Sequence, residues 1–110
     1  FTDAGFITIT AVISPFREDR ESVRKIFDPI QFVEIFVDCP IEECERRDVK
    51  GHYRRARKGE ISNFTGVSSP YESPENPEIW LKSDRQSVHE CIKIIVDYLN
   101  KKKNISSCEP

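Results

Sequence analysis

Two nearly uninterrupted apolar runs constrain the fold of this chain more than any other feature. The first run, FITITAVI, covers residues 6–13, and the second, FVEIFV, covers residues 32–37 with Glu34 as its one charged member. Strands that are buried on both faces have such sequences, whereas half-exposed strands alternate apolar and polar residues. Both runs therefore predict buried strands.

A short helix is expected between these runs, because Val23, Ile26 and Phe27 recur at helical spacing before Asp28-Pro29 ends the pattern. Two buried strands joined by a helix form a right-handed parallel crossover, so the fold class is α/β. Residues 79–81 predict one further short strand. So few strands make a poor parallel sheet alone, and we expect either a larger domain or a second chain to complete it.

The last part of the chain predicts an amphipathic helix. Ser87-Val88-His89-Glu90 has the form of a capping box, and the lysines at 101–103 suit the negative end of a helix dipole. We expect residues 104–110 to be a frayed tail. The apolar face of the helix is predicted from the spacing of Val88, Cys91, Ile92, Ile95, Val96 and Leu99.

Composition limits the classes of function. A chain of 110 residues has room for one small domain, and a net charge of -2 drives it toward neither nucleic acid nor anionic membrane. No apolar run approaches the roughly 20 residues that span a bilayer. The four cysteines lack zinc-site spacing, so we expect reduced thiols and a cytoplasmic location, with one disulfide left open as the alternative.

The segment after the first apolar run is a candidate anion site. Ser14, Arg17 and Arg20 follow its carboxyl end, where ligands bind in open α/β sheets. One hydroxyl and two guanidiniums could hold a phosphate or sulfate. The alternative, which composition alone favours, is a Ser-Pro turn followed by solvated arginines.

A basic segment covers residues 46–58, where seven of thirteen residues are Lys or Arg. Gly51 and Gly59 bracket its second half and could act as hinges, so that the segment closes over polyphosphate. The alternatives are an ordinary solvated helix face and, less favoured, contact with nucleic acid.

A long loop is expected over residues 63–78, which contain three prolines. Its first residues, Asn63-Phe64-Thr65-Gly66, combine an aromatic ring with small polar groups. Phe64 could stack on a nucleobase, or it could anchor the loop in the core.

Taken in order, short motifs along the chain resemble the adenylylsulfate kinases. Each motif is weak by itself, whereas the ordered set is specific and extends from residue 1 to about residue 100. The motifs are Phe1-Thr2-Asp3-Ala4-Gly5, Ile13-Ser14-Pro15-Phe16-Arg17, Phe36-Val37-Asp38, Cys44-Glu45-Arg46-Arg47-Asp48-Val49-Lys50-Gly51, Tyr53-Arg54-Arg55-Ala56-Arg57, Gly59-Glu60-Ile61, Phe64-Thr65-Gly66, Pro70-Tyr71-Glu72 and Pro77-Glu78-Ile79.

This resemblance implies an incomplete P-loop NTPase-like parallel sheet flanked by helices, with residues 1–103 as the carboxyl-terminal part of the kinase domain. It implies transfer of the γ-phosphoryl of MgATP to the 3′-hydroxyl of adenosine 5′-phosphosulfate, a step of sulfate assimilation. It also implies contacts to the sulfate-nucleotide by Ile13, Ser14, Arg17, Lys50, Asn63 and Phe64, contacts to ATP by Arg46, Arg85 and Gln86, and a mobile lid that carries Arg54, Arg55 and Arg57.

Ser14 is the candidate catalytic residue, because the family's matching serine is often recorded as a phosphoserine intermediate. Direct in-line transfer is chemically sufficient, and we therefore prefer Ser14 as a binding residue. The resemblance further implies a homodimer of the intact enzyme, or fusion to a sulfurylase domain.

The sequence departs from the family in one respect that matters for activity. None of the 110 residues forms a Gly-rich loop ending in Gly-Lys-Ser/Thr, so the phosphate cradle and the Mg²⁺ ligands are expected outside them. We therefore expect this polypeptide to be inactive alone. The alternative is a non-catalytic, truncated relative that binds nucleotides or a partner.

Overall fold

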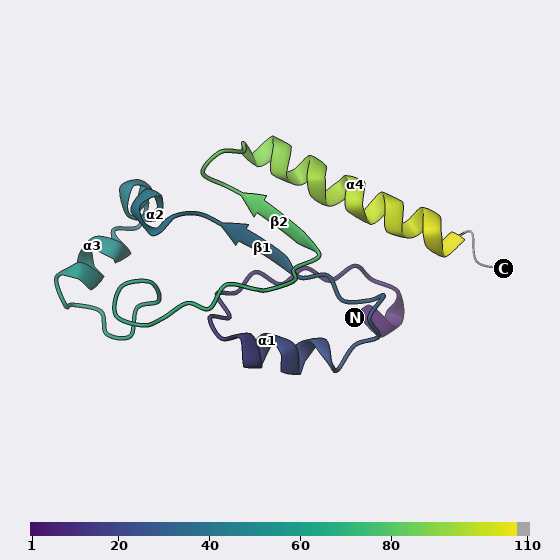
Figure 1. Ribbon diagram of the computed structural model, residues 1–110, viewed down its shortest axis with the longest axis horizontal. Helices are drawn as coiled ribbons and strands as arrows, with labels where there is room; N and C mark the ends of the chain where they lie inside the picture. Colours follow the sequence, from purple (N-terminus) through teal and green to yellow (C-terminus); the bar gives the residue numbers. More distant parts are fainter. Residues whose placement is uncertain (108–110) are drawn as a thin grey trace.

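The computed structural model describes residues 1–107 and has an α/β architecture, as the sequence predicts (Figure 1). Two strands lie side by side, with α4 on one side of them and α1 on the other, while α2 and α3 lie beyond the end of β1. The elements in chain order are the 3-10 helix η1 Thr2–Ala4, α1 Arg17–Arg24, β1 Ile35–Asp38, α2 Ile41–Arg47, α3 His52–Arg57, β2 Ile79–Lys82 and α4 Val88–Ser107.

The sheet has two parallel strands, with Ile35 opposite Ile79 and Val37 opposite Leu81. The strands expected over residues 32–37 and 79–81 are both present, with ends that differ from the prediction by at most three residues. The prediction that the first of them is buried on both faces is wrong, because Phe36 is 7% exposed whereas Val37 is 61% exposed. The connection between them contains α2, α3 and the long loop expected over residues 63–78. Parallel pairing needs such a crossover, because a tight turn reverses the chain direction.

The first apolar run does not form the expected strand. Residues 6–13 are irregular, and Ile7 and Ile9 are 78% and 88% exposed. A strand exists only through a hydrogen-bonded ladder with a neighbour, and no ladder joins this run to the rest of residues 1–107. The crossover predicted between the two apolar runs is therefore wrong for this structure, and β1 pairs with β2 instead.

Helix α4 begins with the predicted capping box. The Glu90 N–H donates to Ser87 Oγ at 3.1 Å, and the Ser87 N–H donates to Glu90 Oε2 at 3.2 Å. The helix packs against β2 and continues to Ser107, so the expected tail begins later than residue 104, while residues 108–110 lie outside the described residues.

The packed face of α4 is rotated from the prediction. Val88 and Ile92 of the predicted stripe are 77% and 53% exposed, and Val96 is also exposed. Since the helix lies along one narrow strand, only a narrow stripe is covered. Its members are Cys91, Ile94, Ile95, Tyr98 and Leu99, all half-buried.

The core is small and lies on the sheet. Phe36 of β1, Ile79 and Leu81 of β2, and Ala56 of α3 are the buried apolar residues of the described chain. The Phe36 ring stacks on Tyr71, with 6.2 Å between ring centroids. This contact fixes the middle of the long loop against the sheet and thereby sets where the loop's first residues lie.

Candidate functional site

An open cavity of about 940 Å³ lies between the amino-terminal segment, β1 and the start of the long loop. Of the residues predicted to contact a sulfate-nucleotide, Ile13, Ser14, Asn63 and Phe64 line this cavity. The two pairs are distant in sequence, and the fold brings them to one hollow. Arg20 of α1 also lines the cavity.

Ser14 and Asn63 share an unusual backbone conformation. Within residues 1–107 they are the non-glycine residues in the left-handed region, with φ of 41° and 53°. This conformation is uncommon for residues with a Cβ, and it persists where surrounding contacts over-determine it, often at ligand sites. Both residues line the cavity, so each of the two chain segments that form it, the one before α1 and the long loop, contains one strained residue.

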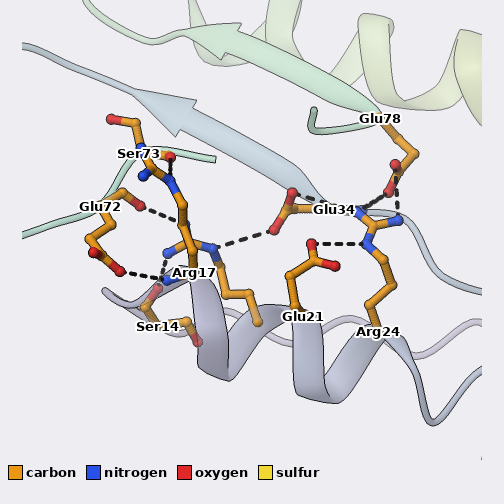
Figure 2. A network of polar contacts seen from close by, with 9 residues as sticks. Ser14, Arg17, Glu21, Arg24, Glu34, Glu72, Ser73 and Glu78 are labelled. Atoms are coloured by element: carbon orange, nitrogen blue, oxygen red, sulfur yellow. Dashed lines mark hydrogen bonds and ion pairs between the residues drawn. The ribbon is translucent and has the colours of Figure 1, made fainter. Parts of the chain in front are cut away.

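Arg20 connects the Ser14 segment to the long loop. Figure 2 shows its partners Ser14, Glu34 and Glu72 beside α1. The Arg20 guanidinium donates to the Ser14 and Glu72 carbonyls and pairs with the Glu34 carboxylate at 3.4 Å. The Arg20 and Glu34 side chains are only 11% and 12% exposed. The Glu72 N–H adds a second tie, because it donates to the Pro15 carbonyl at 2.8 Å.

Arg24, one turn later on α1, extends this network away from the cavity. It donates to both Glu78 carboxylate oxygens, at 2.9 and 3.1 Å, and pairs with Glu34 at 3.5 Å. The hydrogen bonds to Glu78 raise the pKa of Arg24 above its usual value. Sequence reasoning missed this network, although Glu34 as the single charge in an apolar run was a signal that it needed a cationic partner.

Arg17, at the start of α1, contacts the long loop and not the Glu34 carboxylate. Its Nε donates to the Ser73 carbonyl at 2.8 Å, and its guanidinium pairs with Glu75 at 3.8 Å. It borders a second, smaller hollow and does not line the cavity. Lys50 is exposed in the turn between α2 and α3 and does not line the cavity either.

The Phe64 ring is half-buried and meets the Tyr53 ring edge to face, with 5.0 Å between centroids. Its N–H donates to Ser68 Oγ at 2.9 Å. Gly66 has a φ of +88°, and a Cβ there would lie 2.8 Å from Ile41 Cδ1. The loop thus packs directly on α2, and this packing holds one side of Phe64 while another side faces the cavity.

The basic segment forms the end of α2 and all of α3, with mostly exposed charges. Glu43 accepts hydrogen bonds from Arg46 and Arg47, which lower the pKa of Glu43 to about 2. Arg57 pairs with Glu45, and Arg55 pairs with Glu60 at 3.2 Å. In the described structure this segment is a solvated helix face, as one of the sequence interpretations has it, with Ala56 as its buried member.

Two glycines and Asp48 define the ends of helix α3. Gly51 and Gly59 have φ of +71° and +78°. The Asp48 carboxylate accepts from the Tyr53 and Arg54 N–H groups at 3.0 and 3.1 Å. Burial raises the pKa of Asp48, but these hydrogen bonds outweigh it and the net pKa is lowered. The helix is therefore capped by a short-range contact and ends in positive-φ turns.

The residues predicted to contact ATP lie at the opposite end of the sheet from α1. Arg46 and Arg85 have side chains that are 71% and 75% exposed. Gln86 Oε1 accepts from the Lys82 N–H at 2.8 Å. Arg47 donates to the Ser83 carbonyl at 3.1 Å, and this contact holds α2 beside the Arg85-Gln86 loop.

Within residues 1–107 no three His, Cys, Asp or Glu side chains gather as they would around a metal ion. Cys39, Cys44 and Cys91 are free thiols. No helix of the described part has the length and apolarity to cross a membrane.

Comparison with known proteins gives one family. The adenylylsulphate kinase family model matches residues 1–82. The chain is 54% identical to a probable adenylyl-sulfate kinase of Halalkalibacterium halodurans over 91% of its length and 50% of that protein's. It is 53% identical to an adenylyl-sulfate kinase of Clostridium acetobutylicum, covering 94% of this chain and 51% of that one.

A solved structure gives the same result. The APS kinase CysC of Mycobacterium tuberculosis, in complex with AMPPNP and APS, superposes with a TM-score of 0.73 and 44% identity. The match covers 81% of this chain and 52% of the other. The chain thus spans about half the length of the relatives it matches, and by both sequence and structure it belongs to the adenylylsulfate kinase family.

Proposed function

We propose that this chain supplies the sulfate-nucleotide pocket and the lid of an adenylylsulfate kinase. The reaction is transfer of the ATP γ-phosphoryl to the 3′-hydroxyl of adenosine 5′-phosphosulfate, giving 3′-phosphoadenosine 5′-phosphosulfate and ADP. The observation that carries the proposal is the meeting of Ile13-Ser14 and Asn63-Phe64 on one cavity, with Ser14 and Asn63 both in the left-handed conformation.

In the pocket, the half-buried Phe64 ring offers a stacking face for the adenine of the sulfate-nucleotide. The Ser14 hydroxyl and the adjoining backbone bind and orient the substrate, so Ser14 acts in binding and no phosphoserine is formed. Lys50 and Arg17 contribute positive charge near the phosphosulfate group once the lid and the loop have adjusted around the ligand.

The ATP base lies near Arg46 and the Arg85-Gln86 loop. Arg54, Arg55 and Arg57 close over the phosphates and stabilise the negative charge of the transition state. Exposed ion pairs are worth at most about 1 kcal/mol, so exchanging a carboxylate partner for a phosphate costs little.

The remaining parts of the activity lie outside this half. Mg²⁺ would neutralise negative charge on the ATP phosphates, and its ligands and the phosphate cradle would come from outside these 110 residues. The 110-residue chain alone is therefore inactive. A homodimer or a sulfurylase fusion belongs to the same proposal, as does a cytoplasmic location, which the free thiols support.

The second candidate is a non-catalytic module that binds a nucleotide or a partner. The observation that supports it is the open cavity itself, which such a module would use for binding alone. Such a module would retain the cavity and lack turnover in any context.

The test is to replace the matching half of the Clostridium acetobutylicum adenylyl-sulfate kinase with this chain, behind that protein's own amino-terminal half. We expect the completed enzyme to form 3′-phosphoadenosine 5′-phosphosulfate from ATP and adenosine 5′-phosphosulfate, and the 110-residue chain alone to form none. A folded, completed enzyme without turnover would favour the module, and turnover by the isolated chain would refute the predicted need for a second half.

A further inference from the structure

We propose that Arg20 is a positioning residue for the sulfate-nucleotide: by holding the Ser14 carbonyl against the long loop, it fixes the strained turn that faces the substrate. This inference rests on the function proposed above, because it concerns the same cavity. Arg20 lines the cavity, and its guanidinium is already hydrogen-bonded to acceptors of the protein.

The contacts of Arg20 join three separate parts of the chain. Its guanidinium donates to the Ser14 carbonyl before α1 and to the Glu72 carbonyl in the long loop, and it pairs with Glu34 just ahead of β1. Figure 2 shows Ser14, Glu34 and Glu72 converging beside α1. One side chain thus connects the substrate-facing turn, the loop and the sheet.

The strain at Ser14 explains why such a connection is needed. A left-handed serine is strained, and it relaxes unless the surroundings hold it. The Arg20 hydrogen bond to the Ser14 carbonyl fixes the peptide on the carboxyl side of that strained residue, and the Glu72 N–H fixes the next carbonyl, that of Pro15, at 2.8 Å. Two consecutive carbonyls are therefore held, the first by a side chain of α1 and the second by the long loop.

The burial of Arg20 argues against direct capture of the anion. Its side chain is 11% exposed and its charge is matched by Glu34, which is 12% exposed. The Tyr71 ring lies across the guanidinium, with 5.8 Å from Cζ to the ring centroid. A sulfate or phosphate would have to displace protein acceptors and oppose the Glu34 charge, so the residue acts through Ser14.

Arg24 offers a matched control. It lies one turn along the same helix, carries the same charge and pairs with the same Glu34, but its hydrogen bonds go to Glu78 and it does not line the cavity. A loss that merely loosens α1 should appear equally in Arg20→Ala and Arg24→Ala. A loss of substrate positioning should appear in Arg20→Ala alone.

The kinetic test uses the enzyme completed with the amino-terminal half of the Clostridium acetobutylicum protein. We expect Arg20→Ala to raise the KM for adenosine 5′-phosphosulfate about tenfold, as loss of a hydrogen bond from a charged group does, and the KM for ATP less than about twofold. Arg20→Lys, the milder variant, should recover part of the loss, and Arg24→Ala should change both constants less than about twofold.

The second test uses hydrogen exchange in the 110-residue chain itself. Arg20→Ala should speed exchange of the Glu72 amide, which donates to the Pro15 carbonyl at 2.8 Å, together with that of the Arg17 amide, which donates to Glu72 Oε1 at 2.9 Å. Arg24→Ala should spare them and speed the Glu34 amide, which donates to Glu78 Oε1 at 2.7 Å. An inactive completed enzyme would overturn the proposed function, while this exchange pattern would still decide whether Arg20 fixes the turn.

Two results would overturn the positioning role. One is an equal rise of the sulfate-nucleotide KM in Arg20→Ala and Arg24→Ala, which would make the network merely structural. The other is unchanged exchange of the Arg17 and Glu72 amides when Arg20 is replaced.

Discussion

The two arginine-rich regions of this chain carry similar charges in different surroundings. On the α1 side, Arg20 and Glu34 are 11% and 12% exposed. On the α2 and α3 side, Arg46 and Arg57 are 71% and 55% exposed, although they too pair with glutamates. The same residue types therefore form a fixed support in one region and a solvated surface in the other.

The comparison shows that burial, more than the number of ion pairs, decides which arginines are fixed and which are free to take another partner. A buried pair that loses one partner leaves an uncompensated charge in a poorly solvated place, so it resists rearrangement. An exposed pair is nearly as stable apart as together, so its arginines can turn to a ligand's phosphates. The α1 side holds the pocket, and the α3 side is suited to move.

The largest expected effect comes from breaking the buried side. Glu34→Ala should lower the free energy of unfolding by about 2–3 kcal/mol, because Arg20 and Arg24 both lose their shared carboxylate. The exposed counterpart, Glu45→Ala, should cost less than about 1 kcal/mol. Urea titration followed by the fluorescence of Trp80 measures both, and equal losses would break the comparison.

A glycine pair sharpens the contrast within the second region. Gly66→Ala should cost somewhat more than about 1 kcal/mol, because its φ is positive and its Cβ would lie 2.8 Å from the flexible end of the Ile41 side chain, which has to rotate away. Gly59→Ala, also at positive φ but with nothing within 4 Å, should cost about 1 kcal/mol from the backbone alone. The same urea titration ranks them, and the reverse order would show that the loop is not packed on α2.

A lid arginine should affect the ligand more than the fold. In the completed enzyme, Arg57→Ala should raise the KM for ATP about threefold at low salt and less at 0.5 M salt, where exposed charges are screened. Lys101→Ala on α4 also removes one positive charge and should leave the KM for ATP unchanged at both salt concentrations. If Arg57→Ala left the KM for ATP unchanged at every salt concentration, α3 would be only a solvated face.

The smallest effect is the titration of Glu43. Because Arg46 and Arg47 lower its folded-state pKa to about 2, the carboxylate stays ionised well below its usual range near 4.5. Its contribution to stability is then complete above about pH 4.5 and is lost as the pH falls toward 2. A carbon-detected magnetic resonance titration should give a midpoint near 2, and Arg46→Ala should raise it; a wild-type midpoint near 4.5 would show that these exposed pairs do not form.

Local signals in the sequence predicted much of this fold. The capping box at Ser87 and Glu90 and the proline-bearing loop depend on neighbouring residues, and both are present. The strand ahead of Asp38 is present because β2 supplies its ladder. Residues 6–13 failed as a strand because a ladder depends on a partner that a local pattern cannot supply.

The candidate site could be predicted only where short motifs in the sequence indicated its residues. The ordered motifs pointed to Ser14 and Phe64, which do line one cavity. The pairing of Arg20 with Glu34 and Glu72 joins residues up to 52 positions apart, and no periodicity reports such contacts. Backbone strain at Ser14 and Asn63 is likewise visible only once the chain is folded.

The most direct measurement of the central claim is the pair of KM values of Phe64→Ala in the completed enzyme. Loss of the ring should raise the KM for adenosine 5′-phosphosulfate about tenfold or more, as expected for a lost base stack, and change the KM for ATP less than about twofold. Phe64→Leu, which keeps apolar volume without a π-face, should behave like the alanine variant. Equal increases for both substrates would contradict the assignment of this cavity to the sulfate-nucleotide.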